Sequence, residues 1–368
     1  MPHAASPLCL SPLPHPPASD RILVIRLGAV GDVARTLPAV SALRAAYPGA
    51  HLTWLVEPAS RSLVEAQPGI DEVLVFPRDE LIDALRRGQL ARFATGWLRF
   101  VRRLRRRRFE LAVDFHALAK SALLAYASGA PLRVSYARPY GREGSIWLAT
   151  ARARLPPPPI SRFARNLGLV AFLGVAVRPA PAPLRVDPEV RRRLAQALGG
   201  GPGPVILHPG TSPGTPHKRW PTEDWATVAR TLASDGLRVL VSCGVAPDER
   251  AAAAAIVAAV DGAAAPAPET ADLEELAALL AQARLFLGSD SGPLHIASLV
   301  GTPVVQLIGP THPIENAPDP GTPSRSVRVP VACSPCRRGC AAAVCMTRIR
   351  PDAVVAAARS LLAASGPG

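Results

Sequence analysis

Short apolar runs rich in β-branched residues alternate with helical stretches along most of this chain. In the first half these runs are RILVIRL, HLTWLVE, DEVLVF and FELAVDFH, and in the second half they are PVILHPG, LRVLVSCG, ARLFLGSD and TPVVQLIGP. Strands that alternate with helices predict a parallel, doubly wound sheet. We therefore expect an α/β fold with one such sheet in each half. Ligands of these sheets bind at the carboxyl ends of the strands, so both halves are expected to face one cleft.

Length and proline content set the expected domain limits. The 368 residues are enough for two ordinary domains. Residues 1–19 contain six prolines, so we expect a disordered leader there, or a start codon placed too early. We place the first domain at 20–180 and the second at 181–368. A proline-rich hinge region is expected over 151–185.

Neither a signal peptide nor a membrane-spanning helix is expected. The first 19 residues have no basic start and no uninterrupted apolar core. The longest apolar run, between Arg165 and Arg178, is about half of the ~20 residues that a spanning helix needs. We therefore expect a cytoplasmic protein with reduced cysteines.

The net charge of +14 is concentrated in the first half. Residues 1–180 hold 25 basic and 12 acidic side chains, whereas residues 181–368 hold 17 and 16. A basic half suits nucleic acid, an anionic membrane surface or a phosphorylated substrate, and charge alone does not choose among these. The densest run, RFVRRLRRRRFE, has seven arginines between Arg99 and Arg108. It is either a solvated helix face or a surface that docks on an acidic membrane or on a phosphorylated lipid acceptor.

The first motif is RLGAVGDVARTLP at residues 26–38. Gly28 and Gly31 leave a strand and open a helix, where backbone N–H groups can approach a bound anion or sugar. The segment is neither a P-loop nor a G-x-G-x-x-G fingerprint. Asp32 is expected at the start of the helix, either at the mouth of the cleft or only as a helix cap.

The second motif is HPGTSPGTPHKRWPTEDW at residues 208–225. A strand is expected to end at His208, and a loop rich in Gly, Thr and Ser follows. Thr211, Ser212 and Lys218 could bind a phosphate through hydroxyls, backbone amides and an ammonium charge. The alternative is a solvated surface loop.

The third motif is GSDSGPLHIAS at residues 288–298. The amides of Ser291 and Gly292 are expected to point from a helix N-terminus towards a phosphate. Asp290 could accept hydrogen bonds from sugar hydroxyls. His295 lies one turn into this helix and is either part of the site or a buried structural histidine.

The last feature is a cysteine cluster in CSPCRRGCAAAVC. It contains Cys333, Cys336, Cys340 and Cys345. Four thiolates at such spacing could hold zinc or a cluster, but only the first gap is the usual two residues. Free or oxidisable thiols are the alternative.

Together the three motifs resemble glycosyltransferase family 9, the lipopolysaccharide heptosyltransferases. The resemblance runs from about Arg21 to the C-terminus and includes the GP-T-P pattern at 309–313. It implies the GT-B fold, with two Rossmann-like domains, and inverting transfer of a sugar from a nucleotide donor without metal or cofactor. The absence of an Asp-x-Asp motif agrees with that expectation.

The resemblance also implies roles for individual residues. Asp32 matches the general base that deprotonates the acceptor, and Lys218 matches the lysine that stabilises the leaving nucleotide. Within CGVAPDER, Asp248 or Glu249 is expected at the donor ribose, and we choose Glu249. The donor-binding residues are then Thr211, Ser212, Lys218, Glu249, Asp290, Ser291, Gly292 and His295. The acceptor-binding residues are then Arg26, Gly31, Arg61, Arg133 and Arg138, with Arg142 as a further candidate.

The implied reaction moves a heptose from ADP-heptose to Kdo or heptose in the lipopolysaccharide inner core. The implied partners are an anionic lipid A–Kdo acceptor and the cytoplasmic face of the inner membrane, and family precedent favours a monomer. Another donor and glycan, a GT-B-like nucleotide-sugar epimerase and a relative with an inactive Asp32 are alternatives. A basic protein that binds nucleic acid is disfavoured, because it has no use for SDSGPLH.

Overall fold

The computed structural model describes residues 8–177, 184–212, 214–336 and 339–364. The chain divides into two compact units, Met1–Ala182 and Pro183–Gly368. Each unit holds one six-stranded sheet. The domain boundary predicted between residues 180 and 181 lies outside the described residues.

The first unit is a doubly wound α/β domain. Its strands are all parallel, in the order β3-β2-β1-β4-β5-β6. They are β1 (Arg21–Ile25), β2 (His51–Val56), β3 (Glu72–Val75), β4 (Leu111–Asp114), β5 (Leu132–Tyr136) and β6 (Ala151–Ala153). Its helices are α1 (Val30–Ala34), α2 (Leu37–Ala46), α3 (Arg61–Glu65), α4 (Arg78–Arg86), α5 (Leu90–Arg105), α6 (Ala119–Ala127) and α7 (Arg162–Phe172).

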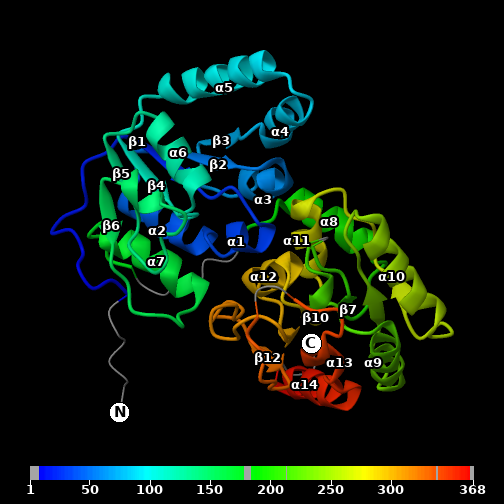
Figure 1. Ribbon diagram of the computed structural model, residues 1–368. Coiled ribbons are helices and arrows are strands. Elements are labelled where there is room, and N and C mark those ends of the chain that lie inside the picture. The colour runs from blue at the N-terminus through cyan, green and yellow to red at the C-terminus, as the bar shows by residue number, and fades with distance from the viewer. Residues whose placement is uncertain (1–7, 178–183, 213, 337–338, 365–368) are drawn as a thin grey trace, which may run out of the picture. The chain divides into compact units, whose positions relative to one another are not determined.

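The helices of the first unit cover both faces of its sheet (Figure 1). Helix α2 packs against α7, and α5 packs against both α4 and α6. One core cluster joins strand residues such as Ile25 to Phe100 and Leu104 of α5. Burial on both faces explains the nearly continuous apolar runs in β1 and β4.

The second unit repeats this design. Its strands are all parallel, in the order β12-β11-β10-β7-β8-β9. They are β7 (Val205–His208), β8 (Val239–Val241), β9 (Ala265–Pro266), β10 (Leu285–Ser289), β11 (Val304–Leu307) and β12 (Ser324–Val327). Its helices are α8 (Pro188–Ala197), α9 (Thr222–Ser234), α10 (Pro247–Ala258), α11 (Leu273–Leu280), α12 (Gly292–Leu299), α13 (Val344–Thr347) and α14 (Pro351–Ala364).

The two sheets have the same topology. Read from β9, the second sheet runs β9-β8-β7-β10-β11-β12, which matches β3-β2-β1-β4-β5-β6 strand for strand. In both, the winding reverses between two central strands, β1 and β4 in one and β7 and β10 in the other. Ligands of open α/β sheets bind beside the carboxyl ends of such strands. The predicted α/β class with two doubly wound, Rossmann-like sheets is confirmed.

Three local expectations differ from the structure. The single helix expected after β1 is two helices, because Pro38 in the first turn of α2 favours a new helix start after Thr36. The expected hinge over 151–185 holds strand β6 and helix α7 within the first unit.

The expected disordered leader also differs from residue 8 onward. Leu10 N donates to Arg154 O at 2.9 Å, and Leu13 N donates to Phe172 O at 2.7 Å. Cys9 is buried. The part of this segment from residue 8 therefore packs on β6 and α7, and residues 1–7 lie outside the described residues.

Candidate functional site

Asp32 lies on α1, at the carboxyl end of β1 and beside the point where the first sheet reverses. The helix cap residue is Ala29, and no side chain caps α1. The interpretation of Asp32 as a cap is therefore wrong. Its carboxylate is available for other partners.

Those partners are three guanidinium groups. Arg26, at the end of β1, forms an ion pair with Oδ2 of Asp32. Arg35 and Arg162 both reach Oδ1 at 2.6 Å. Arg26 also donates from Nη1 to the carbonyl of Phe115 at 2.6 Å, which fixes it between β1 and β4. Asp32 is thus held from β1, α1 and α7 at once.

This arrangement keeps Asp32 ionised. Burial acts to raise the pKa of the Asp32 carboxyl, but the charges of Arg26, Arg162, Arg35 and Arg165 act against it and hold that pKa well below its usual range. Burial in turn lowers the pKa of Arg26. A carboxylate with so many cationic neighbours is a weak proton acceptor, so a change of partners is needed before it can act as a strong base.

Strand β4 brings a second carboxyl to the same edge of the sheet. Asp114 is buried and accepts hydrogen bonds from His116 N at 2.9 Å, Ala117 N at 3.0 Å and Ser121 Oγ at 2.9 Å. Burial raises the pKa of Asp114 to about 6 and lowers that of His116 to about 3. Asp114 therefore orders the loop after β4, which carries His116 and the carbonyl that holds Arg26.

In the second unit, the third motif centres on Asp290, directly after β10. Lys218 Nζ donates to Asp290 Oδ2 at 2.9 Å and to its carbonyl at 3.1 Å. Thr311 Oγ1 donates to Oδ2 at 2.7 Å, and His295 Nε2 lies 3.3 Å from Oδ1. His295 is fully buried, so it supports Asp290 from within α12. The second and third motifs thus meet at Lys218 and Asp290.

Two buried hydroxyls flank this network. Ser291 precedes the first turn of α12, and its side chain does not cap the helix. Among the described residues, neither Ser291 Oγ nor Ser289 Oγ has a hydrogen-bond partner, although both atoms are buried. A helix N-terminus with unpaired donors favours an anion, and the phosphate contact of Ser291 and Gly292 stays a prediction.

Thr211 and Ser212 lie in the loop after β7. Thr211 is buried, accepts from Arg219 Nε at 3.3 Å and donates to Thr215 O at 3.1 Å. Ser212 is exposed, and its carbonyl accepts from Thr215 N at 2.8 Å, which closes a turn. Only part of this loop is therefore solvated. The hydroxyls of Thr211 and Thr215 hold it in place by hydrogen bonds to backbone carbonyls of the same loop.

Asp248 and Glu249 have different surroundings. Asp248 is exposed and pairs with Arg219 at 2.5 Å. Glu249 is half-buried, and its carboxylate lies under two glycines: a Cβ on Gly210 would come within 2.8 Å of it and one on Gly244 within 2.0 Å. Burial raises the pKa of Glu249. Glu249 therefore adjoins the loops after β7 and β8, and its role at the donor ribose stays a prediction.

The predicted acceptor residues do not all lie together. Arg26 and Gly31 are buried beside Asp32, and Arg138 is exposed in the loop after β5. Arg61 is exposed on α3, where it pairs with Glu65 at 2.7 Å.

Arg133 lies away from this group. On β5 it is paired in register with Ala112, two residues before the end of β4. Its guanidinium donates to Leu148 O at 2.9 Å and to Ala130 O at 2.8 Å. Arg142 is exposed, and its backbone N–H donates to Ala117 O at 3.1 Å. The structure therefore brings Arg26 and Gly31 to Asp32 but not Arg133.

The cysteine-rich segment lies beside the loops that carry Lys218 and Thr311. Cys336 N donates to Pro310 O at 2.7 Å, and a Cβ on Gly339 would come within 2.4 Å of the His217 ring. Cys333, Cys336, Cys340 and Cys345 are all free thiols. Within the described part of the chain, no group of three or more His, Cys, Asp or Glu side chains is arranged to hold a metal ion. In the same part, no helix is both long and apolar enough to cross a bilayer.

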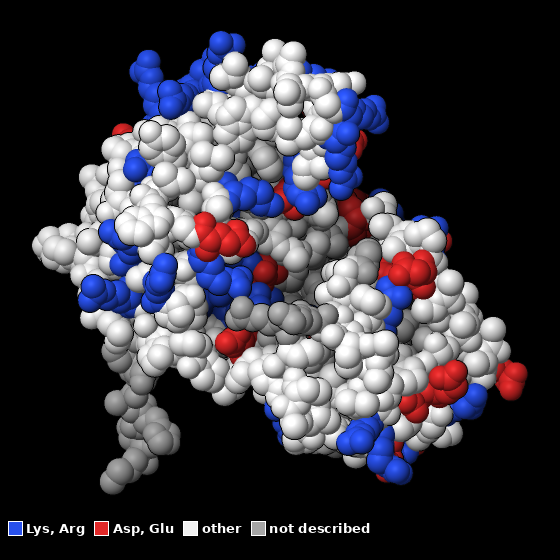
Figure 2. Space-filling model, in the orientation of Figure 1, with Lys and Arg blue, Asp and Glu red and all other residues white. Residues whose placement is uncertain are grey.

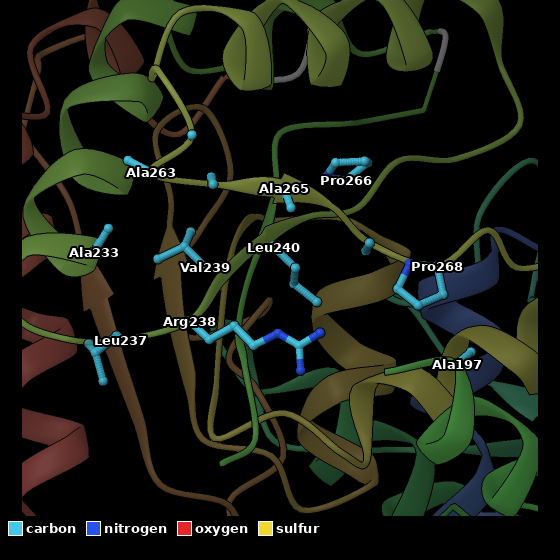
Figure 3. Close-up of a pocket in the computed structure, with 13 residues that line it drawn as sticks. Ala197, Ala233, Leu237, Arg238, Val239, Leu240, Ala263, Ala265, Pro266 and Pro268 are labelled. Atoms are coloured by element: carbon cyan, nitrogen blue, oxygen red, sulfur yellow. The ribbon is translucent and has the colours of Figure 1, made fainter. Parts of the chain in front are cut away.

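A pocket of about 580 Å³ lies elsewhere in the second unit (Figure 3). It runs along β8 and the edge strand β9, and most of its lining is Ala, Leu, Val and Pro. Arg238 is its one charged residue. The pocket contains none of the predicted site residues, so it is not the candidate site.

Comparison with known proteins decides the family. The chain matches glycosyltransferase family 9 (heptosyltransferase) over residues 97–344, about two thirds of its length. It is 30% identical over 309 residues to lipopolysaccharide heptosyltransferase 1 of Pseudomonas aeruginosa, covering 80% of this chain and 79% of that protein. The chain belongs to glycosyltransferase family 9. It is therefore a glycosyltransferase, and the predicted enzyme class is confirmed.

Other known glycosyltransferases are similar in sequence or fold. The lipopolysaccharide core heptosyltransferase OpsX of Haemophilus influenzae is 24% identical over 82% of each chain. A family 9 glycosyltransferase from Veillonella parvula superposes with a TM-score of 0.75 at 22% identity, over 94% of this chain and 97% of that one. Escherichia coli heptosyltransferase WaaC with ADP superposes with a TM-score of 0.74 at 20% identity, over 93% and 99%. The predicted GT-B fold class is confirmed.

Several residues of the site were not predicted from the sequence. Arg35 lies inside the first motif, but an arginine-rich composition hides its role. Arg162 and Arg165 lie in the segment expected to be a hinge. Asp114 and Thr311 each follow an apolar run that ends at the same edge as a motif, and that position is the signal that could have found them.

Proposed function

We propose that this family 9 enzyme transfers a heptose from ADP-heptose to Kdo or heptose in the inner core of lipopolysaccharide, with inversion and without a metal. The observation that carries the proposal is the placement of its motifs. Asp32 lies where one sheet reverses, and Lys218 and Asp290 lie where the other reverses. Ligands of such sheets bind at these two positions.

In the proposed reaction, Asp32 takes the proton from an acceptor hydroxyl as that oxygen attacks the anomeric carbon of the heptose. The new glycosidic bond forms as the bond from the anomeric carbon to the phosphate oxygen breaks. ADP leaves with the bonding electron pair. One carboxylate and one leaving group are enough for a single displacement, which inverts the anomeric configuration.

Lys218 supplies the electrostatic part of the reaction. Its ammonium group already lies on Asp290, and it is 17% exposed, so it can also reach a ligand. A positive charge placed beside the departing diphosphate stabilises the transition state more than the bound donor. Asp290, held by Lys218, Thr311 and His295, has a fixed carboxylate that can orient hydroxyls of the donor sugar.

The remaining donor contacts follow from the loops after β7, β8 and β10. The buried Ser291 hydroxyl and the N-terminus of α12 suit a phosphate. Thr211 and Ser212 lie on the loop after β7 and suit the same diphosphate. Glu249, half-buried between two glycine loops, suits the two hydroxyls of a ribose.

The test is release of ADP from ADP-heptose, with and without a Kdo-bearing acceptor, by the wild type and Asp32→Asn. We expect acceptor-dependent release that falls at least a hundredfold in Asp32→Asn, while ADP-heptose binding measured by calorimetry stays within about threefold. Release that needs no acceptor points to an epimerase or hydrolase instead. Full activity in Asp32→Asn removes Asp32 from the base role.

We also propose that the enzyme works at the cytoplasmic face of an anionic membrane, attached through α5. Phe100 and Leu104 are the buried side of this helix, whereas Leu90 and Leu98 are 67% and 50% exposed. Basic side chains gather over the C-terminal end of α5 (Figure 2). Among the described residues no ion pair is formed by the exposed arginines Arg99, Arg102, Arg103 and Arg106. Exposed leucines and arginines on one helix suit the boundary between lipid headgroups and acyl chains, and Leu98 is directly next to Arg99.

A further inference from the structure

The three guanidinium groups on Asp32 are not equivalent. The side chains of Arg26 and Arg35 are 5% and 6% exposed, whereas that of Arg162 is 29% exposed. Arg162 is also the most distant in sequence, 130 residues from Asp32. It is the first residue of α7, while the other two belong to the same segment as Asp32.

The two buried arginines are held by the backbone as well as by Asp32. Arg26 donates to Phe115 O at 2.6 Å, and Arg35 Nε donates to Gly31 O at 3.0 Å. Both would lose a backbone hydrogen bond if they moved. Arg162 lies at the start of a helix, directly after the cap residue Ser161, and its side chain is the most solvent-accessible of the three, so it is the one that an incoming ligand can reach.

The charges around Asp32 do not balance. Four cations, Arg26, Arg35, Arg162 and Arg165, act on this one carboxylate. Arg165 lies over the rings of Tyr136 and Tyr140, at 5.5 Å and 6.0 Å from their centroids. The remaining titratable neighbours are His116, kept neutral by burial, and Asp114, which is buried and hydrogen-bonded. An excess of positive charge at a substrate site favours an anionic ligand.

We infer that Arg162 is an exchangeable partner of Asp32: it binds a carboxylate or phosphate of the acceptor and releases Asp32 when it does so. The inference rests on the proposed function, since it assigns the recognition of the acceptor at the same site. It explains how a carboxylate can be both held in place and basic. Arg26 and Arg35 keep Asp32 oriented, and binding of the acceptor removes the third positive charge.

This exchange couples acceptor binding to base strength. With Arg162 on Asp32, the carboxylate is too strongly stabilised to accept a proton well. When Arg162 moves to the acceptor anion, the pKa of Asp32 rises because one neighbouring positive charge is gone. Asp32 then becomes more basic only when a hydroxyl is present to deprotonate.

The experiment compares Arg162→Gln and Arg162→Lys with the wild type, and uses Arg152→Gln as the matched control. Arg152 is an exposed arginine on β6, in the same unit and away from Asp32. Three acceptors are used: Kdo-bearing lipid A, its carboxyl methyl ester, and its dephosphorylated form. KM and kcat are measured for each acceptor, and kcat/KM is measured against pH.

For the intact acceptor, we expect Arg162→Gln to raise KM on the order of tenfold, to keep kcat within about threefold, and to be rescued by Arg162→Lys. The increase in KM disappears with the ester if the acceptor group is the Kdo carboxylate, and with the dephosphorylated form if it is a phosphate. In the plot of kcat/KM against pH, the fall in activity on the acid side moves to higher pH in Arg162→Gln, because the pKa of Asp32 rises when it loses a positive neighbour. Arg152→Gln changes none of these values.

An equal rise in KM for all three acceptors, or a fall in activity on the acid side that does not move, overturns the inference and leaves the transferase proposal intact. If the wild type transfers no heptose, the proposed function fails, and calorimetric titration of the three acceptors into wild type and Arg162→Gln still tests the exchange. Equal affinity of the two proteins for the intact acceptor then overturns it.

Discussion

Lys218 contacts Asp290 through both its carboxylate and its backbone carbonyl, so the ammonium group joins two loops that come from different strands. We expect Lys218→Ala to lower kcat by about a hundredfold or more, because in the proposed function the leaving diphosphate then loses its positive partner. Steady-state release of ADP measures this change. The control is Lys120→Ala, which removes the chain's other lysine, paired with Glu57 in the first unit. If both variants lose activity equally, Lys218 has no special part in departure of the nucleotide.

His208 gives a pH prediction at the same scale. It is buried, its Nδ1 lies 3.0 Å from Ser242 Oγ, and burial lowers its pKa to about 4. Unfolded histidine binds a proton near pH 6.5, so the folded state is penalised as pH falls from 6.5 towards 4, and the stability present above 6.5 is lost. The loss for this one residue is about 3 kcal/mol.

The matched variant is His208→Asn, whose amide can keep the bond to Ser242 without titrating. Denaturant unfolding of both proteins at pH 7 and pH 4 is the measurement. We expect the wild type to lose more stability over this range than His208→Asn. Parallel curves for the two proteins contradict the assignment of His208 as a buried neutral histidine.

At the scale of elements, helix α5 carries the membrane prediction. Replacing Arg99, Arg102 and Arg106 by Gln removes three exposed charges. Each arginine near an anionic bilayer contributes about 1 kcal/mol, so affinity for vesicles rich in phosphatidylglycerol is expected to fall on the order of a hundredfold. Vesicle co-sedimentation at constant salt measures this affinity.

The control makes the same change in charge on another helix. Arg191, Arg192 and Arg193 are exposed on α8 in the second unit, and their replacement by Gln is expected to leave vesicle binding unchanged. An equal loss in both triple variants indicates that only net charge matters. Equal binding to vesicles of phosphatidylcholine alone contradicts electrostatic docking.

The elements themselves were predictable where burial leaves a clear pattern. Strands β1, β2, β7 and β10 are buried on both faces and appear in the sequence as apolar runs. The edge strands β9 and β12 were missed, because β9 has only two residues and β12 reads SRSV, with polar side chains towards solvent. Helix α7 was missed because prolines at 156–159 suggested a hinge, although Ser161 caps a new helix directly after them.

At the scale of the molecule, the site was predictable where one segment carries it. The motifs at 26–38, 208–225 and 288–298 each contain a complete strand-to-helix turn, so residues such as Asp32 and Asp290 could be found by position alone. Arg162 reaches Asp32 across 130 residues of sequence. No local pattern predicts such a contact in a chain with 40 arginines, because the contact depends on the packing of α7 against α2, the helix that follows α1.

The uneven charge of the two units leads to the last prediction. Residues 1–180 hold 25 basic and 12 acidic side chains, and residues 181–368 hold 17 and 16, so the long-range field arises from the first unit. Raising NaCl from about 0.1 M to about 0.5 M shortens the screening length below ~10 Å and weakens attraction that acts over longer distances. We therefore expect KM for the anionic acceptor to rise several-fold, while KM for ADP-heptose changes by less than about twofold, since in the proposed function the donor is held by direct contacts such as that with Lys218. Steady-state kinetics with each substrate varied in turn measures both constants, and an equal response of the two contradicts separate recognition by the basic and neutral units.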